Sequence, residues 1–341
     1  MLMAPARLHD RALGALAGVA IGDAMGMPTQ TLTRAQIAAA YGPVTGFRDA
    51  APDHPVSAGL RAGTITDDTE QSLLLARHLI ARGGRIDQEK WAGELLAWER
   101  DTHARGVNDL LGPSTRRAIE ALQRGVPVSE AGRSGTTNGA AMRIVPVAIA
   151  TPAAPLGRLV DAVEESCRLT HHTAPAIGAA SAVAAAVSAA LDGAGLDDAL
   201  AAALAAAALG ERRGEPSAAD SITRRIGQAL ALASGGGAAD RIAASVGTGV
   251  SALESVPMAF AILKLAGADP WRSALLSATI GDDTDTIGAI ACGMAGACTG
   301  MAGIPADAWA RVREVNGLDL DATVAGLLRL RAARAAKAGG G

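Results

Sequence analysis

Two short acidic segments, more than two hundred positions apart, carry the residues best suited to chemistry. The first reads Ile65-Thr66-Asp67-Asp68-Thr69, and the second reads Gly281-Asp282-Asp283-Thr284-Asp285-Thr286. Clustered carboxylates raise each other's pKa and cost stability unless a cation lies between them. An all-oxygen set of carboxylates and hydroxyls suits a hard ion such as Mg²⁺ or Mn²⁺ and not Zn²⁺. The two segments therefore indicate a shared site for a divalent metal.

Each segment also has a purely structural interpretation. Asp and Thr are ordinary N-cap residues, so Thr66 and Asp67 could simply begin a helix over 68–82. The second segment likewise precedes a helix of small residues over 287–299. One segment alone favours helix capping, whereas two segments that share the Asp-Asp-Thr step favour a common site.

Composition indicates the fold class. The chain has 341 residues and 49% hydrophobic content, enough for a large core, and two half-sites near opposite ends favour one domain. Aromatic residues make up 2%, strand-like alternation is scarce, and Ala and Leu at helical spacing dominate. We expect an all-α fold: a single compact multi-helix domain over 1–338, with a disordered tail at 339–341.

Charge and cysteine content indicate which partners and which cellular compartment to expect. A net charge of −3 and a pI near 6.1 leave no basic footprint for nucleic acid or an anionic membrane. The apolar stretches 176–190 and 200–209 fall short of about 20 membrane-spanning residues, and no signal peptide is recognisable. Cys167, Cys292 and Cys298 lack C-x-x-C spacing and are expected to be buried and reduced. We expect a cytoplasmic protein with no membrane or nucleic-acid partner, and the oligomeric state stays open.

The two acidic segments resemble the metal-binding segments of the ADP-ribosylglycohydrolases, the family that includes the dinitrogenase-reductase-activating glycohydrolases. The resemblance runs from Gly14 to about Thr299 through four blocks in the family's order. It implies an all-α fold around a central dinuclear centre. The implied ligands of two Mg²⁺ ions, with Mn²⁺ as the alternative, are Thr66, Asp67, Asp68, Asp283, Asp285 and Thr286. Asp282, where the family often has Gly, is left outside this set.

Two further blocks are similar to the family. The stretch 22–26 offers glycines for close backbone approach, and Asp23 is either a partner of the metal ligands or a helix-end residue. The loop 132–143 opens a helix, so its backbone amides favour an anion. By resemblance, the contacts of this loop with phosphate or ribose are Ser134, Gly135, Thr136, Asn138, Gly139 and Met142. Arg143 would instead hold the loop in place.

A histidine pair and a glutamate are weaker candidates. His171 and His172 precede an alanine-rich helix over 174–191, where a packing role and a site role are both open. The family has Thr-His near the substrate pocket here, which favours His171. Glu254 lies in a Glu-Ser-Val-Pro run that is similar to the family, although a packing role is favoured. The next helix is expected to begin around Pro257.

Gln30 is the main departure from the family, which carries at this position a Glu assigned to acid/base or substrate-orienting work. An amide can hold a hydroxyl or water but cannot transfer a proton at neutral pH. Either another carboxylate takes the role or the substrate differs. The resemblance implies a catalytic set of Asp67, Asp68, Asp283 and Gln30, in which Asp283 is a candidate to accept the proton of water.

The implied activity is a Mg²⁺-dependent hydrolase that cleaves an N- or O-glycosidic ADP-ribosyl bond and releases ADP-ribose. Its substrate would be an ADP-ribosylated protein or a small ribosyl compound. Gln30 keeps two alternatives open. One is hydrolysis of a nucleoside or nucleotide with the same metals, and the other is a catalytically weak protein that binds ADP-ribose.

Several elements must position these residues. The Pro-, Gly- and Asp-rich stretch 41–63 is expected to be an irregular rim of the site. Trp91, Leu95 and Trp98 form one stripe of a helix and are expected in the core. A hinge over 106–113 precedes a helix over 114–124, and an amphipathic basic helix over 321–337 ends the chain. The small residues of 287–299 imply close approach to neighbouring helices.

Overall fold

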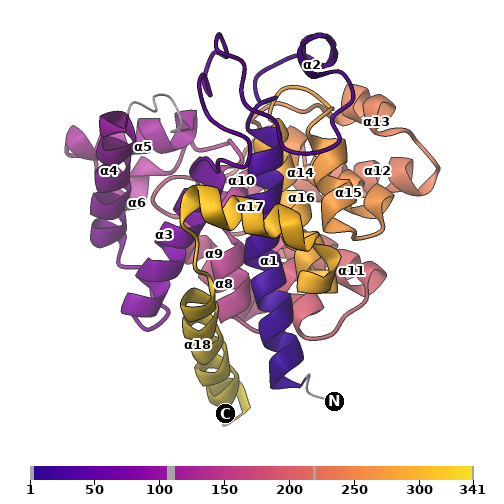
Figure 1. Ribbon diagram of the computed structural model, residues 1–341. Helices are drawn as coiled ribbons and strands as arrows, with labels where there is room; N and C mark the ends of the chain where they lie inside the picture. Colours follow the sequence, from indigo (N-terminus) through magenta and orange to yellow (C-terminus); the bar gives the residue numbers. More distant parts are fainter. Residues whose placement is uncertain (1–3, 106–111, 218–219, 340–341) are drawn as a thin grey trace.

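The computed structural model describes residues 4–105, 112–217 and 220–339, and within them the chain is helical without a β-strand (Figure 1). The α-helices are α1 (Pro5–Gly26), α2 (Arg34–Tyr41), α3 (Asp67–Ala81), α4 (Gln88–Ala104), α5 (Pro113–Gln123), α6 (Val128–Ala131), α7 (Gly139–Met142), α8 (Val145–Ala150), α9 (Leu156–Cys167), α10 (Ala174–Leu191), α11 (Leu196–Gly210), α12 (Ile222–Ser234), α13 (Ala239–Val246), α14 (Ala252–Ala266), α15 (Pro270–Ser277), α16 (Thr284–Thr299), α17 (Ala306–Asn316) and α18 (Asp321–Gly339), with a 3₁₀ turn, η1 (Met301–Gly303). The all-α prediction is confirmed.

Local sequence signals set many of the helix ends. The side chains of Asp87 and Asp269 accept hydrogen bonds from first-turn amides and so cap α4 and α15. Gly267 and Gly317 follow α14 and α17 in the left-handed conformation that glycine adopts without strain. These caps fix where each helix begins or ends, so the connecting loops leave the core at defined points.

Helix α1 runs through the middle of the molecule and packs antiparallel to α16 (Figure 1). The two backbones are in direct contact because glycines recur every four residues along α1. A Cβ at Gly18 would lie 2.1 Å from the carbonyl oxygen of Cys292, and one at Gly22 would lie 2.1 Å from that of Gly288. A Cβ at Gly26 would lie 2.3 Å from the amide nitrogen of Asp285. The predicted close approach of both segments is confirmed, and it places the end of α1 against the start of α16.

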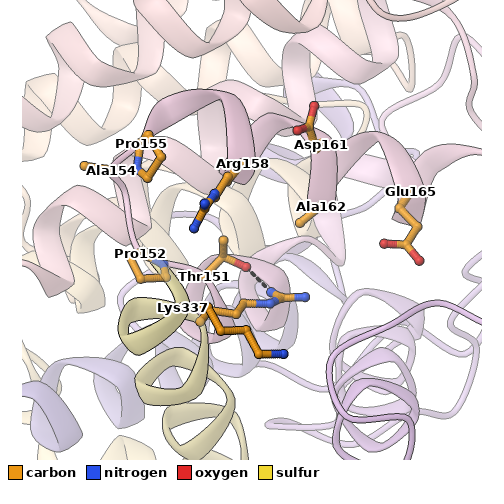
Figure 2. A pocket seen from close by; sticks show the side chains of 10 residues that line it. Thr151, Pro152, Ala154, Pro155, Arg158, Asp161, Ala162, Glu165 and Lys337 are labelled. Carbon is orange, nitrogen blue, oxygen red and sulfur yellow. Dashed lines mark hydrogen bonds between the residues drawn. The ribbon is translucent and has the colours of Figure 1, made fainter. Parts of the chain in front are cut away.

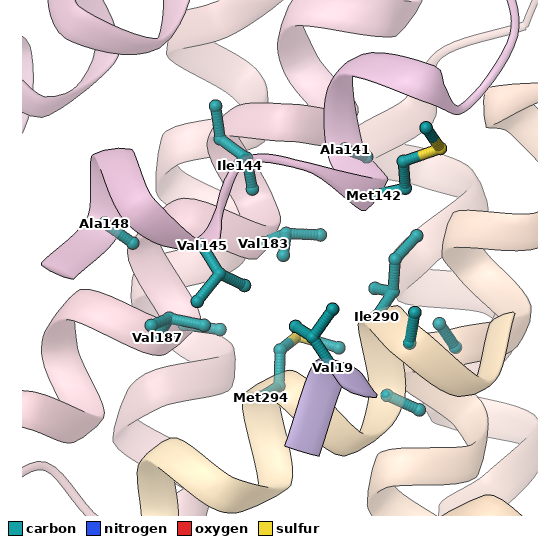
Figure 3. Packing of buried hydrophobic residues seen from close by; sticks show 14 of the residues in the cluster. Val19, Ala141, Met142, Ile144, Val145, Ala148, Val183, Val187, Ile290 and Met294 are labelled. Carbon is teal, nitrogen blue, oxygen red and sulfur yellow. The ribbon is translucent and has the colours of Figure 1, made fainter. Parts of the chain in front are cut away.

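The core surrounds this helix pair. Figure 3 shows Val19 of α1, Ile290 of α16, Val183 of α10 and Val145 of α8 pointing toward one another. All four side chains are buried. Helix α10 is long and apolar enough to span a membrane by length and composition, and 94% of it is buried inside the protein. It is therefore longer than the apolar stretch 176–190 suggested.

The final helix, α18, is held by two arginines, of which Arg331 is buried. Arg331 is 4% exposed and donates hydrogen bonds to the carbonyl oxygens of Ala148 and Thr151 and to the carboxylate of Asp192. Arg334 donates to the hydroxyl of Thr151, as the dashed line in Figure 2 marks. These bonds attach α18 to the end of α8, because each guanidinium satisfies carbonyl groups that α8 leaves free.

Other predictions about the elements have mixed outcomes. Trp91, Leu95 and Trp98 are buried as predicted, and the stretch 42–66 contains no helix. The prediction that a helix begins around Pro257 is wrong. Helix α14 begins at Ala252, because the hydroxyl of the N-cap residue Ser251 accepts the amide of Leu253, and Pro257 lies inside the helix. Most of the predicted hinge at 106–113 and the tail residues 340–341 lie outside the described residues.

We expect the contact between α1 and α16 to tolerate no added side chain. Gly18→Ala should lower the free energy of unfolding by about 3 kcal/mol, because the methyl group would overlap a backbone carbonyl. Gly93→Ala is the matched control, since a Cβ there meets nothing within 4 Å and alanine favours the helix by about 0.5–1 kcal/mol. Chemical denaturation measures both, and equal stability of the two variants would contradict this packing.

Candidate metal and substrate site

Three helix ends meet around one small cavity. The carboxyl end of α1 contributes Asp23, and the first turn of α3 contributes Asp67 and Asp68. The start of α16 contributes Asp283 and Asp285. The cavity has a volume of about 150 Å³, and the predicted site residues that line it are Gln30, Asp67, Asn138, Gly139, Met142, Asp283, Asp285 and Thr286. The fold thus brings the two acidic segments together.

Asp23 caps helix α3 from a different part of the chain. Its carboxylate accepts hydrogen bonds from the amides of Thr66 and Thr69, at 2.9 and 3.1 Å, and from both hydroxyls. Thr66 provides no cap of its own. Because a carboxylate at a helix N-terminus satisfies free N–H groups, Asp23 fixes the first turn of α3. It therefore positions Asp67 and Asp68, which follow Thr66 in the chain.

Asp68 and Asp285 each leave one buried oxygen without a partner. Asp68 is fully buried, and its Oδ2 faces the hydroxyls of Thr286 at 3.4 Å and Thr66 at 3.5 Å. Its Oδ1 and the Oδ1 of Asp285 receive no hydrogen bond. A buried carboxylate oxygen without a partner is costly. These two atoms are therefore candidates for contact with a group that the protein alone does not supply.

The carboxylates raise one another's pKa. Burial raises the pKa of Asp68 well above its usual value, and the charges of Asp67 and Asp285 add to the effect. Asp67 and Asp285 are raised in the same way, by burial first and then by neighbouring carboxylates. Burial also raises the pKa of Asp23 and of Asp283 to about 6, although hydrogen bonds to each oppose the rise. A cation would reverse this penalty, because it favours the charged form of every member.

The donor set fits a hard divalent ion. It consists of carboxylate and hydroxyl oxygens, the ligands that Mg²⁺ and Mn²⁺ prefer. Within the described residues, no group of three or more Asp, Glu, His or Cys side chains is arranged to hold a metal ion as it stands. The hydroxyls of Thr66 and Thr286 would have to complete such a set. The dinuclear centre therefore stays a prediction.

The loop over 132–143 reaches the cavity through its second half only. Asn138 is buried and donates from its side-chain amide to the carboxylate of Asp283 and, at 2.9 Å, to the hydroxyl of Ser255. Arg143 donates to Gln71 at 2.7 Å and to the hydroxyl of Thr170 at 2.6 Å. These bonds attach the loop to α3 and to the acidic cluster.

Comparisons with known proteins identify the family of the chain. A sequence profile of the ADP-ribosylglycohydrolases matches residues 4–337. The chain belongs to the ADP-ribosylglycohydrolase family. It is 34% identical over 331 residues to the uncharacterized protein YegU of Escherichia coli K12, covering 96% of this chain and 99% of YegU.

Two further similarities concern proteins with descriptive names. The ADP-ribosyl-[dinitrogen reductase] glycohydrolase of Rhodospirillum rubrum is 36% identical over 174 residues, which are 48% of this chain and 52% of that protein. A solved structure described as an ADP-ribosylglycohydrolase-related protein complex superposes with a TM-score of 0.67 at 28% identity, covering 95% of this chain and 99% of that one. The similarity to the solved structure extends over nearly the whole fold.

Several residues assigned by resemblance to the family do not line the cavity, and two of them are the implied metal ligands Thr66 and Asp68, which are fully buried. Ser134, Gly135 and Thr136 lie outside its lining, and Ser134 and Thr136 are exposed. His171 is fully buried behind the loop, where its Nε2 is 3.0 Å from the hydroxyl of Thr137. Burial, reinforced by neighbouring arginines, lowers the pKa of His171 well below its usual value, so the ring is neutral. It supports the loop and does not face the cavity.

The remaining candidates also point elsewhere. His172 lies 3.3 Å from the carboxylate of Glu164. Glu254 accepts the amide of Gly249 at 3.1 Å and does not line the cavity, in keeping with the packing role. Asp282 lies outside the lining too, and its carboxylate accepts the hydroxyl of Thr248 at 2.7 Å. None of these side chains replaces the acid that the family has at position 30.

Gln30 lines the cavity, and a residue that sequence reasoning missed fixes its orientation. Its side-chain nitrogen donates to the hydroxyl of Ser57 at 2.9 Å. Ser57 is fully buried, and its amide donates to Nδ1 of His54 at 2.8 Å. This arrangement leaves the amide oxygen of Gln30 available as an acceptor. Nothing in the composition of the stretch 41–63 singled out Ser57, whereas Val56 of the same stretch lines the cavity as a rim would.

Other lining residues carried no sequence signal. They are Thr31, Gly112, Pro113, Thr115, Thr137 and Val250. Thr137 stands in the loop over 132–143, where the resemblance to the family favours its neighbours 134–136 instead. Thr115 comes from α5, whose pattern indicates only an amphipathic helix. Their proximity to the acidic cluster is a property of the tertiary fold.

We expect the protein in chelator to lose stability as the pH rises. The folded chain has carboxylates with pKa near 6, Asp23 and Asp283, whereas the unfolded value is 3.8. Between these values the folded state holds more protons, so its extra stability is present at low pH and is lost as the pH rises through about 6. Thermal unfolding from pH 5 to pH 8 should show a falling midpoint.

Asp68→Asn tests whether buried, mutually repelling carboxylates cause this loss of stability. It removes one buried charge, so at pH 8 in chelator the variant should be more stable than the parent by roughly 1–3 kcal/mol. Asp307→Asn is the matched control, because Asp307 is exposed and is also the second residue of its helix. A midpoint that rises with pH, or an Asp68 variant no more stable than the control, would contradict mutual repulsion in this cluster.

Proposed function

We propose that the protein hydrolyses an ADP-ribosyl linkage and releases ADP-ribose, with two Mg²⁺ or Mn²⁺ ions held by Thr66, Asp67, Asp68, Asp283, Asp285 and Thr286. Membership of the ADP-ribosylglycohydrolase family supports the reaction class. One observation supports this site as the place of the reaction. It is the cavity in which Asp67 of the first segment meets Asp283 and Asp285 of the second, with an unpaired carboxylate oxygen on Asp285 and another on the buried Asp68.

Related proteins support the kind of substrate. The Rhodospirillum protein is named for ADP-ribosyl-[dinitrogen reductase], and a relative in Pseudomonas putida, 32% identical over 151 residues, is named an ADP-ribosylarginine hydrolase. These matches cover 48% and 43% of this chain. We therefore propose an ADP-ribosylated protein as the substrate, without assigning the modified residue.

The bound metals would neutralise the carboxylates, orient the ribose hydroxyls and lower the pKa of a nearby water. The chain's own residues supply the rest. Asp283 lines the cavity and is held by Asn138, so it is placed to accept the proton of the attacking water. Asp68 is fully buried and outside the cavity lining, so it would hold a metal from the protein side. Gln30 offers a fixed hydrogen-bond acceptor to the sugar or the water.

One observation favours a second candidate. The cavity of about 150 Å³ is smaller than the 300–1,000 Å³ typical of sites that enclose a drug-sized ligand. It can receive a sugar ring, while the rest of an ADP-ribosyl group would lie across the exposed rim. A nucleoside or nucleotide would need less of that outer surface, so hydrolysis of a smaller ribosyl compound is the alternative. A weakly catalytic ADP-ribose-binding protein is the alternative from another class, because Gln30 cannot transfer a proton.

We expect metal-dependent release of ADP-ribose from at least one ADP-ribosylated substrate. The measurement is product release, with Mg²⁺ and with chelator, from ADP-ribosyl-arginine, ADP-ribosyl-serine, O-acetyl-ADP-ribose and several nucleosides. Asp68→Asn should abolish the metal-dependent part, and Asp307→Asn should leave it intact. Release from nucleosides alone would replace the proposal with its second candidate. Binding of ADP-ribose without any turnover would support the binding protein.

We expect Ser57 to act through Gln30. Gln30→Ala should lower kcat/KM at least tenfold by removing the acceptor, and Ser57→Ala should lower it about three- to tenfold by freeing the amide to turn. In the double variant the second change should cost almost nothing, because the interaction is already lost. Additive losses in this double-mutant cycle, with circular dichroism confirming folding, would show that the two residues act separately.

A further inference from the structure

A second and larger cavity lies between α9 and α18, and it shares no residue with the acidic site. Its volume is about 430 Å³, within the range of small-molecule sites. Figure 2 shows it bounded by the connection from α8 to α9, by one face of α9 and by α18. The lining residues are Thr151, Pro152, Ala154, Pro155, Arg158, Asp161, Ala162, Glu165, Arg334 and Lys337.

Three cationic side chains border this cavity, and they differ in how they are held. Arg334 is fixed by hydrogen bonds to the hydroxyl of Thr151 and to the carbonyl oxygens of Ala150 and Gly84. The side chains of Arg158 and Lys337 make no hydrogen bond or ion pair with any described residue. Two positive charges are therefore left uncompensated at the cavity, beside a third that is rigid.

The two acidic lining residues are already engaged elsewhere. The carboxylate of Asp161 lies 2.8 Å from the guanidinium of Arg213, outside the cavity. Glu165 accepts the amide of Ile86 at 2.9 Å. In Figure 2 both carboxylates stand apart from the charged ends of Arg158 and Lys337. They therefore do not neutralise the two unpaired cations by direct contact.

The rest of the wall is apolar and stiff. It consists of the rings of Pro152 and Pro155 and the methyl groups of Ala154 and Ala162. Prolines and alanines lose almost no side-chain freedom when a ligand covers them. A ligand with a compact apolar body would therefore be received at little entropic cost, provided that its charged group faces the cations.

We propose that this cavity binds a small organic phosphate monoester. A phosphate monoester carries between one and two negative charges near neutral pH and has three acceptor oxygens. Its charge matches the two unpaired cations, and its oxygens suit the guanidinium of Arg158 and the ammonium of Lys337. The body attached to the phosphate occupies the proline-lined part. This inference is independent of the function proposed for the acidic site.

The test is isothermal titration calorimetry with phenyl phosphate, in chelator so that no metal at the acidic site can recruit it. Phenyl phosphate should bind more tightly than inorganic phosphate, which lacks the body, and more tightly than benzoate, which carries one charge. Phenol should not bind. Arg158→Gln with Lys337→Gln should weaken binding of phenyl phosphate at least tenfold.

Two further variants test whether binding of phenyl phosphate needs the cavity itself or only positive charge on the protein. Arg272→Gln with Arg329→Gln removes the same charge from exposed positions outside the lining, so it should change the dissociation constant less than twofold. Ala162→Leu keeps every charge but fills the cavity, so it should abolish binding of phenyl phosphate. Absence of binding to the parent protein would overturn the proposal, as would unchanged binding in the Arg158 and Lys337 variant. Binding of benzoate or phenol as tight as that of phenyl phosphate would also overturn the proposal.

Discussion

Direct backbone contact between α1 and α16 is the constraint on which the candidate site depends. Glycines at every fourth position of α1 remove the side chains that would hold the helices apart. Because the helices are antiparallel, the end of α1 lies against the first turn of α16. Gly26 contacts the backbone of Asp285, and Asp23, one turn earlier in α1, reaches across to cap α3. The same contact therefore fixes both acidic segments.

That packing concentrates negative charge where the protein can least accommodate it. Asp68 is fully buried and Asp285 is 3% exposed, and burial together with neighbouring carboxylates raises the pKa of both. The N-terminal ends of α3 and α16 offset part of this cost, since free amides and the helix dipole favour carboxylates there. The offset is incomplete, because one oxygen of each residue stays unpaired. Stability and a cation-ready site are thus opposed in the metal-free protein.

The sequence predicted the parts that local chemistry determines. The helical class, the glycine contacts at 22 and 26 and the buried tryptophan stripe follow from residue type and spacing. The meeting of the two acidic segments is a tertiary contact that is predictable because their shared Asp-Asp-Thr step indicates one site. Contacts set by tertiary structure could not be predicted in this way. Ser57 matters because a loop places it against Gln30, and residues 134–136 lie outside the cavity lining although Asn138, Gly139 and Met142 belong to it. Pro257 was misjudged because an upstream serine caps α14 first.

Gln30 is best understood together with the acidic cluster. It is 8% exposed and lines the same cavity as Asp67 and Asp283. A glutamate in this place would be another buried acid among carboxylates, so its pKa would rise and it would tend to hold a proton. The amide reproduces the shape and hydrogen bonding of that protonated acid but cannot release its protons. In the proposed reaction, the leaving group would therefore depart without a proton from position 30, or would take one from water or from another side chain such as Asp283. The identity of residue 30 thus bears on which bond the proposed reaction can cleave, whereas membership of the family supports the reaction class.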